Sequence, residues 1–256
     1  MTTPFDRLLQ RAYDDRAVSG LVVGGSRGKG LGTDLSDWDV YVVVRAEDDV
    51  LRVRDDLSTD VVPGVIDLCS VFTVDQFEKH AAPGDSEEWN RYNFAHLVPS
   101  LDRTPGRVLQ RLCDEKEWLP EQVATARAGV ALDAFLNSYY RALKNERDGN
   151  QMASSLDAAE SVPWVLEFVF TVERRVRPYN KFLAWEVRTH PLERQWGPAG
   201  DVTVPLLNVV QTGSLAALAA IFRYVESGAR DLDLGGVVDA WGDWAVAAMR
   251  EGTARR

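Results

Sequence analysis

Two aspartates separated by one residue, Asp37 and Asp39, have the spacing in this chain that most clearly suggests chemistry. Asp39 lies in the β-rich run 38–44, and residues i and i+2 of a strand project from the same face. Two adjacent carboxylates repel each other unless a cation lies between them, and oxygen ligands favour Mg²⁺ over zinc or copper. The pair therefore predicts a divalent metal site, while Trp38 and the alternate valines face the opposite way into a core.

A glycine–serine pair, Gly25-Ser26, precedes the aspartates, with ten residues between Ser26 and Asp37. Glycine lets a backbone approach a ligand closely, and the start of a helix offers N–H groups that have no partner within the helix. The Ser26 hydroxyl adds a further donor, so the segment suits phosphate oxygens. A cation site beside a phosphate site is what phosphoryl or nucleotidyl transfer requires.

A third acidic residue, Asp67, interrupts the apolar run 65–69. A carboxylate that is buried and unpaired costs several kcal/mol by order of magnitude, so we expect Asp67 to have a partner. Because neighbouring strands lie about 5 Å apart, Asp67 can reach the same cluster as Asp37 and Asp39. Two roles are open to it: it could bind the metal, or it could take the proton from an attacking hydroxyl.

The elements that must position these residues alternate between helix and strand patterns in the first hundred residues. The predicted helices cover 5–15 and 46–57, and the predicted strands cover 18–23, 38–44 and 61–72. The glycine-rich segment 24–32 is predicted to be a turn. Three strands with intervening helices indicate a small mixed sheet.

The second half of the chain has apolar residues at helical spacing. The predicted helices cover 121–147, 152–175, 179–187, 206–227 and 237–250, with Pro163 expected to start or kink one of them. We therefore expect an α+β protein with two domains. An N-terminal domain over 1–110 has a small mixed sheet with flanking helices, and a C-terminal domain over 111–256 is a helical bundle.

Composition and charge exclude several classes of protein. No apolar run reaches the about 18–20 residues that a membrane helix needs, and no secretory signal is visible, so we expect a cytoplasmic protein with no membrane association. The two cysteines, Cys69 and Cys113, lack a zinc-binding spacing and are expected to be structural. The net charge of −10 disfavours nucleic acid as a main partner and suits a cationic small-molecule acceptor.

The arrangement of these motifs resembles the signature of the DNA polymerase β-type nucleotidyltransferase superfamily. That signature is a Gly-Ser pair, an intervening segment and then Asp-x-Asp followed by apolar residues, and Gly25, Ser26, Asp37 and Asp39 match it. Asp67 occupies the place of the third strand carboxylate. The helical second half is similar to the antibiotic-modifying branch, the aminoglycoside nucleotidyltransferases and their relatives.

The resemblance implies a reaction and its participants. It implies ATP or another nucleoside triphosphate as donor, Mg²⁺ as cofactor, release of pyrophosphate, and a hydroxyl acceptor, with an aminoglycoside-like antibiotic as the leading candidate. In that branch a lysine of the helical domain commonly contacts the triphosphate, which makes Lys181 the first candidate and Lys144 the second. Residues 88–91 lie where relatives line the acceptor pocket.

Two other interpretations fit the same sequence. One is a protein- or RNA-modifying nucleotidyltransferase of the toxin–antitoxin type, which the helical second half leaves open. The other is a non-catalytic nucleotide-binding module, although such modules tend to lose a metal ligand and this chain keeps all three aspartates. An Asp39→Ala variant separates these classes, because only an enzyme has turnover to lose.

Overall fold

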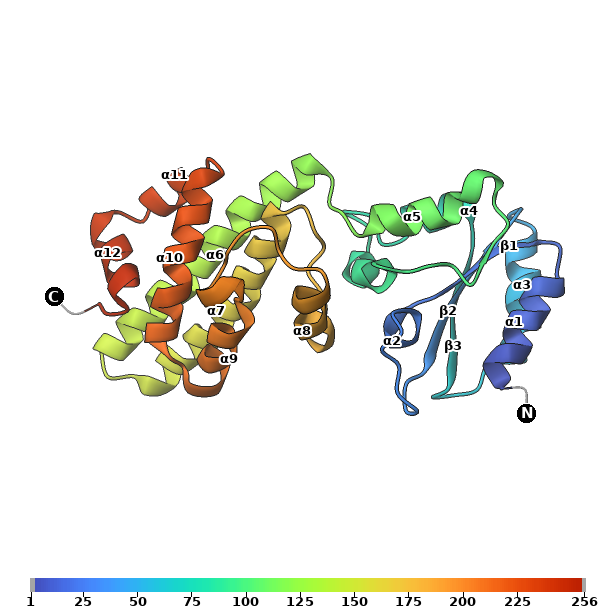
Figure 1. Cartoon of the computed structure of the whole chain (residues 1–256), viewed down its shortest axis with the longest axis horizontal. Helices are drawn as coiled ribbons and strands as arrows, with labels where there is room; N and C mark the ends of the chain where they lie inside the picture. The colour runs from blue at the N-terminus through green and yellow to red at the C-terminus, as the bar shows by residue number, and fades with distance from the viewer. Residues whose placement is uncertain (1–2, 255–256) are drawn as a thin grey trace. The chain divides into compact units, whose positions relative to one another are not determined.

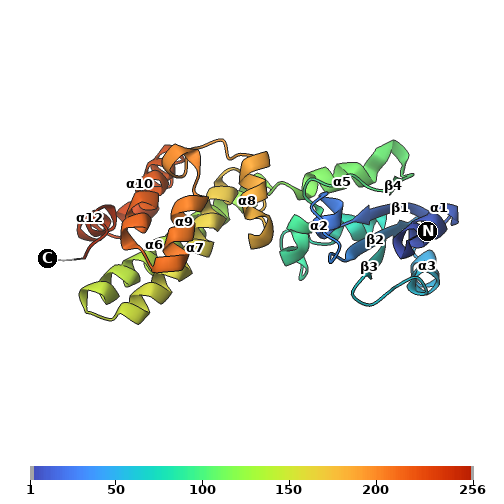
Figure 2. The ribbon, with the colours of Figure 1, turned by 60° about the horizontal axis from the view of Figure 1, so that its bottom comes forward.

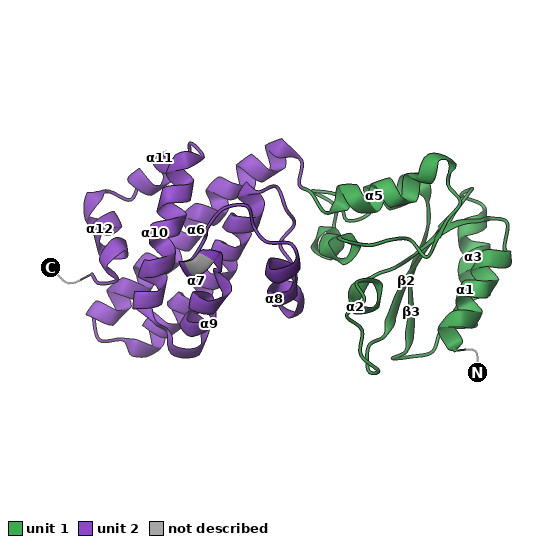
Figure 3. Ribbon diagram, in the orientation of Figure 1, with its two compact units in different colours: residues 1–118 green, residues 119–256 purple. Residues whose placement is uncertain are grey.

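The computed structural model describes residues 3–254, with the side chain of residue 199 left out. It consists of two compact units, Met1–Trp118 and Leu119–Arg256, which Figure 3 shows in green and purple. The first unit contains a sheet with helices, and the second contains helices. The α+β class predicted from the sequence is therefore confirmed.

The first unit is built on a four-stranded sheet in the order β3-β2-β1-β4, whose strands are all labelled in Figure 2. The strands are β1 (Val18–Val23), β2 (Trp38–Val44), β3 (Ile66–Thr73) and β4 (Leu101–Asp102). β1 is antiparallel to both β2 and β4, whereas β2 and β3 are parallel, so the sheet is mixed, as predicted. Strand β4 was not predicted, because a strand of two residues carries no periodic pattern in the sequence.

Helices cover both faces of this sheet. They are α1 (Pro4–Asp14), α2 (Gly25–Gly28), α3 (Asp49–Ser58), α4 (Val74–Lys79) and α5 (Val108–Lys116), with two 3₁₀ segments, η1 (Glu88–Phe94) and η2 (Pro105–Arg107). α1 and α3 lie together against one face, as the views of Figures 1 and 2 agree. Residues of α4, η1 and α5 pack on the other face.

Strand β2 separates two hydrophobic clusters by its alternation. Val40, Val42 and Val44 belong to the cluster under α1 and α3, whereas Tyr41 and Val43 belong to the cluster on the opposite face. At the start of the strand, the Trp38 ring stacks on Phe5 of α1 with ring centroids 3.7 Å apart. Because side chains alternate along a strand, Asp39 projects from the face opposite Trp38, as the sequence pattern predicts.

The division between the two units differs from the predicted boundary at 110/111. It falls after Trp118, because α5 spans the predicted boundary and belongs to the first unit. Leu109, Leu112 and Cys113 of α5 are buried in the cluster that also contains Val22 of β1. An amphipathic helix whose apolar side is committed to the sheet cannot be divided between two cores.

The second unit consists of helices around one core. They are α6 (Glu121–Arg147), α7 (Gln151–Val172), α8 (Asn180–Thr189), α9 (Thr203–Thr212), α10 (Leu215–Asp231), α11 (Gly235–Asp239) and α12 (Asp243–Glu251), with the 3₁₀ segment η3 (Pro198–Gly200). Pro163 lies inside α7. No helix in residues 3–254 is long and apolar enough to cross a membrane.

Two helices that the sequence predicts as continuous are each divided. The stretch 206–227 is split between α9 and α10 at Gly213, whose φ of +67° ends α9, and the Ser214 side chain caps α10 by accepting from the Ala217 N–H. The stretch 237–250 is split at Gly242, which has a φ of +80°. A left-handed glycine ends a helix, but an isolated glycine is also tolerated inside one, so the sequence alone did not reveal either break.

Candidate active site

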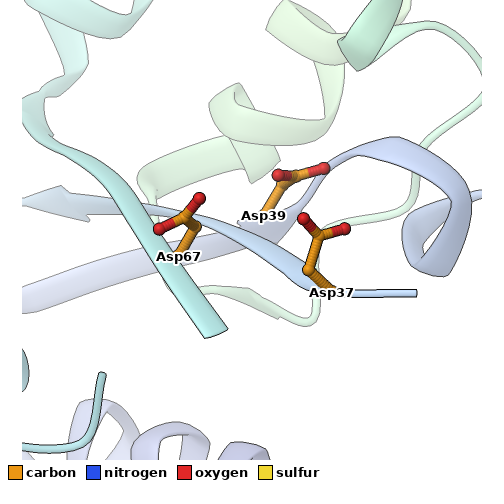
Figure 4. Close-up of side chains that lie close together, drawn as sticks. All are labelled: Asp37, Asp39 and Asp67. Carbon is orange, nitrogen blue, oxygen red and sulfur yellow. The ribbon is translucent and has the colours of Figure 1, made fainter. Parts of the chain in front are cut away.

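The three aspartates singled out from the sequence lie together at one edge of the sheet. Asp37 immediately precedes β2, Asp39 is its second residue, and Asp67 is directly opposite Asp39 on the parallel strand β3. One oxygen from each carboxylate lies within 4.8 Å of the others. Figure 4 shows the three side chains projecting to the same side of the two strands.

The topology explains why these residues meet. Parallel strands begin at the same edge of a sheet, so the N-terminal ends of β2 and β3 place their acids side by side. β1 is antiparallel to β2, so it ends at that edge and delivers the Gly24-Gly25-Ser26 segment there. The Gly24 N–H donates to the backbone carbonyl of Asp39 at 2.8 Å, which fixes the end of β1 to the start of β2.

The donor set fits a hard divalent cation. Asp37 and Asp67 are exposed and Asp39 is half-buried, so all three carboxylates can be reached from solvent. Adjacent oxygens around one Mg²⁺ are about 3 Å apart and opposite ones about 4 Å, so oxygens within 4.8 Å of one another can share one ion after small side-chain rotations. Three carboxylates this close repel one another until a cation is shared between them.

The surroundings of Asp67 differ from the expectation of a buried acid in an apolar strand. β3 is an edge strand, and the Asp67 side chain is exposed, so no burial cost forces it to find a partner. Its position beside Asp39 is instead set by the register of β2 and β3.

The glycine segment approaches the acidic cluster more closely than any other residue type would allow. Gly25 has a φ of +60°, and a Cβ built on it would lie 2.2 Å from Asp39 Oδ2. A Cβ on Gly24 would lie 2.7 Å from Asn93 Nδ2. Contacts below about 3 Å need one of the atoms to move, so a side chain at Gly25 would push the turn and the Asp39 carboxylate apart, and a side chain at Gly24 would displace the Asn93 amide.

Ser26 lies at the second position of α2, which begins at Gly25. The segment 24–32, predicted as a turn, therefore contains one short helix. The first N–H groups of a helix have no carbonyl partner within it. The Ser26 hydroxyl makes no hydrogen bond to any residue between 3 and 254. Hydroxyl and amide donors are therefore available beside the acids, and they suit anionic oxygens.

Arg27 holds the backbone just before Asp37. Its Nε and Nη2 atoms donate to the Ser36 carbonyl at 3.1 and 2.9 Å, and its guanidinium lies 5.0 Å from the centre of the Trp38 ring. The Thr33 N–H donates to Ser36 Oγ at 2.9 Å, which closes the same loop. The loop that presents Asp37 is therefore tied to α2.

Sequence reasoning missed Asn93 of η1. This buried side chain accepts a hydrogen bond from the Gly25 N–H at 2.7 Å through Oδ1, and its Nδ2 donates to the Tyr41 hydroxyl at 3.0 Å. Asn90, one turn earlier, donates to the same hydroxyl at 2.9 Å. Two asparagines three residues apart in the aromatic-rich segment 89–94 are the signal that could have identified them.

Residues 88–91, which the resemblance places at an acceptor pocket, differ in their surroundings: Arg91 is buried, whereas Trp89 is exposed. Arg91 is buried, and its guanidinium donates to the carbonyls of Ala81, Glu115 and Trp118 at 3.0, 3.0 and 2.8 Å. It therefore holds the first unit together. Trp89 is the most exposed aromatic of the segment, with 68% of its surface accessible.

The two cysteines are both free thiols in different surroundings. Cys113 is buried in α5, as expected of a structural residue. Cys69 is exposed on β3, contrary to expectation, and its Sγ lies 4.0 Å from Asp39 Oδ1. Partial burial of the sulfur, followed by the negative charge of Asp39, raises the pKa of the Cys69 thiol to about 11. The thiol therefore stays protonated at neutral pH.

Lys144 and Lys181, the lysines expected to contact a triphosphate, belong to the second unit. Lys144 lies in α6 with its Nζ 5.0 Å from the centre of the Tyr140 ring, and Lys181 lies near the start of α8 with its Nζ 4.8 Å from the Phe182 ring. The residues that the structure gathers into one site are therefore Asp37, Asp39 and Asp67 with the Gly25-Ser26 turn.

Comparison with family models and with curated proteins found no match for this chain. The acidic cluster and the glycine turn are therefore the features from which a function can be inferred.

Proposed function

We propose that this protein is a Mg²⁺-dependent nucleotidyltransferase that moves a nucleoside monophosphate, AMP from ATP, onto a hydroxyl of a small-molecule acceptor. One observation carries this proposal. Three carboxylates have oxygens within 4.8 Å of one another, and one of them, Asp39, lies directly against a Gly-Ser turn, with the Cβ position of Gly25 only 2.2 Å from its Oδ2. Nucleotidyl transfer requires cation ligands and hydrogen-bond donors to phosphate oxygens at the same place.

Each residue of the site has a role in the proposed reaction. Asp37 and Asp39 would hold the cation, and a bound cation would supply positive charge to the triphosphate and to the departing pyrophosphate. The Ser26 hydroxyl and the amides at the start of α2 donate to phosphate oxygens. Gly25 keeps these donors against the carboxylates, because any side chain there would push the two groups apart.

The transfer itself exchanges one phosphorus–oxygen bond for another. The acceptor oxygen forms a bond to the α-phosphorus, the bond from that phosphorus to the bridging oxygen breaks, and pyrophosphate leaves with the bonding electron pair. The hydroxyl proton passes to Asp67, which is exposed at the edge strand beside Asp39 and is therefore open to an incoming acceptor. Proton transfer of this kind contributes about 10²–10⁴-fold to rate.

The charge of the chain favours a cationic acceptor. The net charge is −10, and a negative surface raises the local concentration of cations. Aminoglycosides are polycations with several hydroxyls, which agrees with the resemblance to the antibiotic-modifying branch. They are therefore the first acceptors to test.

The proposal is tested by pyrophosphate release. The protein is incubated with Mg²⁺, each of the four nucleoside triphosphates, and a panel of aminoglycosides and lincosamides. We expect release that requires one nucleotide and one acceptor, and that is lost in Asp39→Asn. Asp55→Asn is the matched control, because it removes the same charge from an exposed position on α3, among helices of the other sheet face.

The outcomes separate the alternatives. Release that survives Asp39→Asn would refute the role of the acidic cluster. No release, together with no Mg²⁺-dependent triphosphate binding in calorimetry, would refute the proposed function. If no acceptor in the panel gives pyrophosphate release but Mg²⁺-dependent triphosphate binding is retained, then the acceptor is a protein or an RNA, or the protein is a non-catalytic binding module.

A further inference from the structure

Asn93 connects two parts of the site that lie far apart in the sequence. It belongs to η1, 68 residues after Gly25, and only 6% of its surface is exposed. Its Oδ1 accepts the Gly25 N–H at 2.7 Å, and its Nδ2 donates to the Tyr41 hydroxyl at 3.0 Å. Tyr41 follows Asp39 by two residues on β2, so Asn93 bridges the glycine turn and the strand that carries the metal ligands.

The two contacts of Asn93 require an amide side chain. One end must accept a hydrogen bond from a backbone N–H, and the other end must donate to a hydroxyl. The Gly25 N–H is the first of α2 and has no acceptor within that helix. Leaving a buried donor unsatisfied is costly, so removal of the amide releases Gly25 from its position.

The position of Gly25 bears directly on the metal ligands. The Cβ position of Gly25 lies 2.2 Å from Asp39 Oδ2 and 3.7 Å from Asn93 Oδ1. The turn therefore lies between the carboxylate and the amide. A shift of the turn changes the distance between the phosphate donors and the cation ligands without altering either group.

Lys29 secures the other end of the same turn. It follows α2 directly, and its Nζ donates to the carbonyls of Tyr92, Asn93 and Ala95 at 3.2, 3.3 and 2.5 Å. The segment 92–95 therefore holds α2 at both ends. Because these carbonyls engage the Lys29 ammonium, its role in the site is to hold this segment.

We infer that Asn93 is a positioning residue for the triphosphate: it fixes the Gly25-Ser26 turn against Asp39 and does not touch the substrate. This inference rests on the proposed nucleotidyl transfer. It assigns to η1 the function of setting the spacing between phosphate donors and metal ligands, together with the end of β1 and the hydrogen bonds from Arg27 to Ser36.

Asn90 provides a matched control within the same segment. Its Nδ2 donates to the same Tyr41 hydroxyl at 2.9 Å, and it is buried to a similar extent, with 7% of its surface exposed. No hydrogen bond from Gly25 to Asn90 occurs in the described part of the chain. Asn90→Leu and Asn93→Leu therefore each remove one hydrogen bond to Tyr41. Asn90→Leu also removes the 3.4 Å contact between Asn90 Nδ2 and His80 Nε2, and only Asn93→Leu releases Gly25.

The test uses the full chain and two readouts. The first is the dissociation constant of ATP at saturating Mg²⁺, measured by calorimetry, and the second is hydrogen exchange of the Gly25 amide, measured by NMR. We expect Asn93→Leu to weaken ATP binding about tenfold or more and to speed exchange at Gly25, while Asn90→Leu changes ATP binding less than about threefold. Asn93→Gln keeps an amide that can both accept and donate, so it should weaken ATP binding less than Asn93→Leu does, and it can be measured if Asn93→Leu does not fold.

Several results would overturn the inference. Equal weakening in Asn90→Leu and Asn93→Leu would assign the effect to Tyr41, and faster exchange at Gly25 with unchanged ATP binding would show that the position of the turn does not matter. Binding by Asn93→Gln as weak as that of Asn93→Leu, with exchange at the Gly25 amide as slow as in the wild type, would exclude the Gly25 contact as the cause. If the wild-type protein binds no ATP with Mg²⁺, the proposed function fails and the inference fails with it, whereas wild-type binding with an unaffected Asn93→Leu rejects the inference alone.

Discussion

Substitution of Gly25 by alanine tests the close approach of the glycine turn to the acidic cluster. The new Cβ would lie 2.2 Å from Asp39 Oδ2, so the carboxylate or the turn must move by about 1 Å to restore an ordinary contact. A displacement of about 1 Å in a catalytic site can cost about 10²-fold in rate. Alanine at a φ of +60° also costs about 1–2 kcal/mol of stability.

Gly30→Ala separates these two effects. Gly30 has a φ of +69°, close to that of Gly25, but a Cβ built on it meets no atom within 4 Å. Both variants should therefore lose about 1–2 kcal/mol in the free energy of unfolding, measured by urea denaturation. Only Gly25→Ala should also lose pyrophosphate release, by about 10²-fold in kcat/KM. Activity of Gly25→Ala equal to that of Gly30→Ala would refute the idea that this turn must touch Asp39.

Two further predictions concern a proton acceptor and a buried lysine. Asp67→Asn should lower kcat by about 10²–10⁴-fold, because an amide accepts no proton, and it should change the dissociation constant of ATP with Mg²⁺ less than about threefold, because Asp37 and Asp39 keep the cation. A rate close to wild type would exclude Asp67 as the proton acceptor. Burial, followed by the positive charge of Arg91, lowers the pKa of Lys116 from 10.5 to about 8. Between pH 8 and pH 10.5, Lys116 is therefore mostly deprotonated in the folded protein and mostly protonated in the unfolded chain. The free energy of unfolding should then rise as the pH increases from about 8 to about 10.5, by at most about 3 kcal/mol. Lys116→Met should remove this rise in urea titrations at several pH values, and an unchanged pH dependence in the variant would show that Lys116 is not its source.

The sequence was sufficient to predict the features of the site that depend on local pattern. The period of two in β2 placed Asp37 and Asp39 on the face opposite Trp38, and the β-branched runs gave the bounds of β1 and β2. Local pattern works here because successive side chains of any strand point to opposite faces, so assigning the strand is enough to put residues two positions apart on one face.

Features that depend on long-range pairing were predicted less well. The register of β2 and β3, which puts Asp67 opposite Asp39, and the exposure of Asp67 follow from β3 being a parallel edge strand. The contact between Asn93 and Gly25 joins residues 68 positions apart, and no periodic signal connects them. The helix breaks at Gly213 and Gly242 were not predicted, for a different reason. Whether a glycine adopts a positive φ depends on the packing around it, which the sequence does not show.

The most direct test of nucleotidyl transfer follows the fate of each phosphate. The protein is incubated with Mg²⁺, the acceptor found in the release assay, and ATP labelled at either the α- or the γ-phosphorus. The account predicts that the α label appears in the acceptor and the γ label appears in pyrophosphate, with both signals lost in Asp39→Asn and kept in Asp55→Asn. Transfer of the γ label to the acceptor, or α-label transfer that persists in Asp39→Asn, would contradict it.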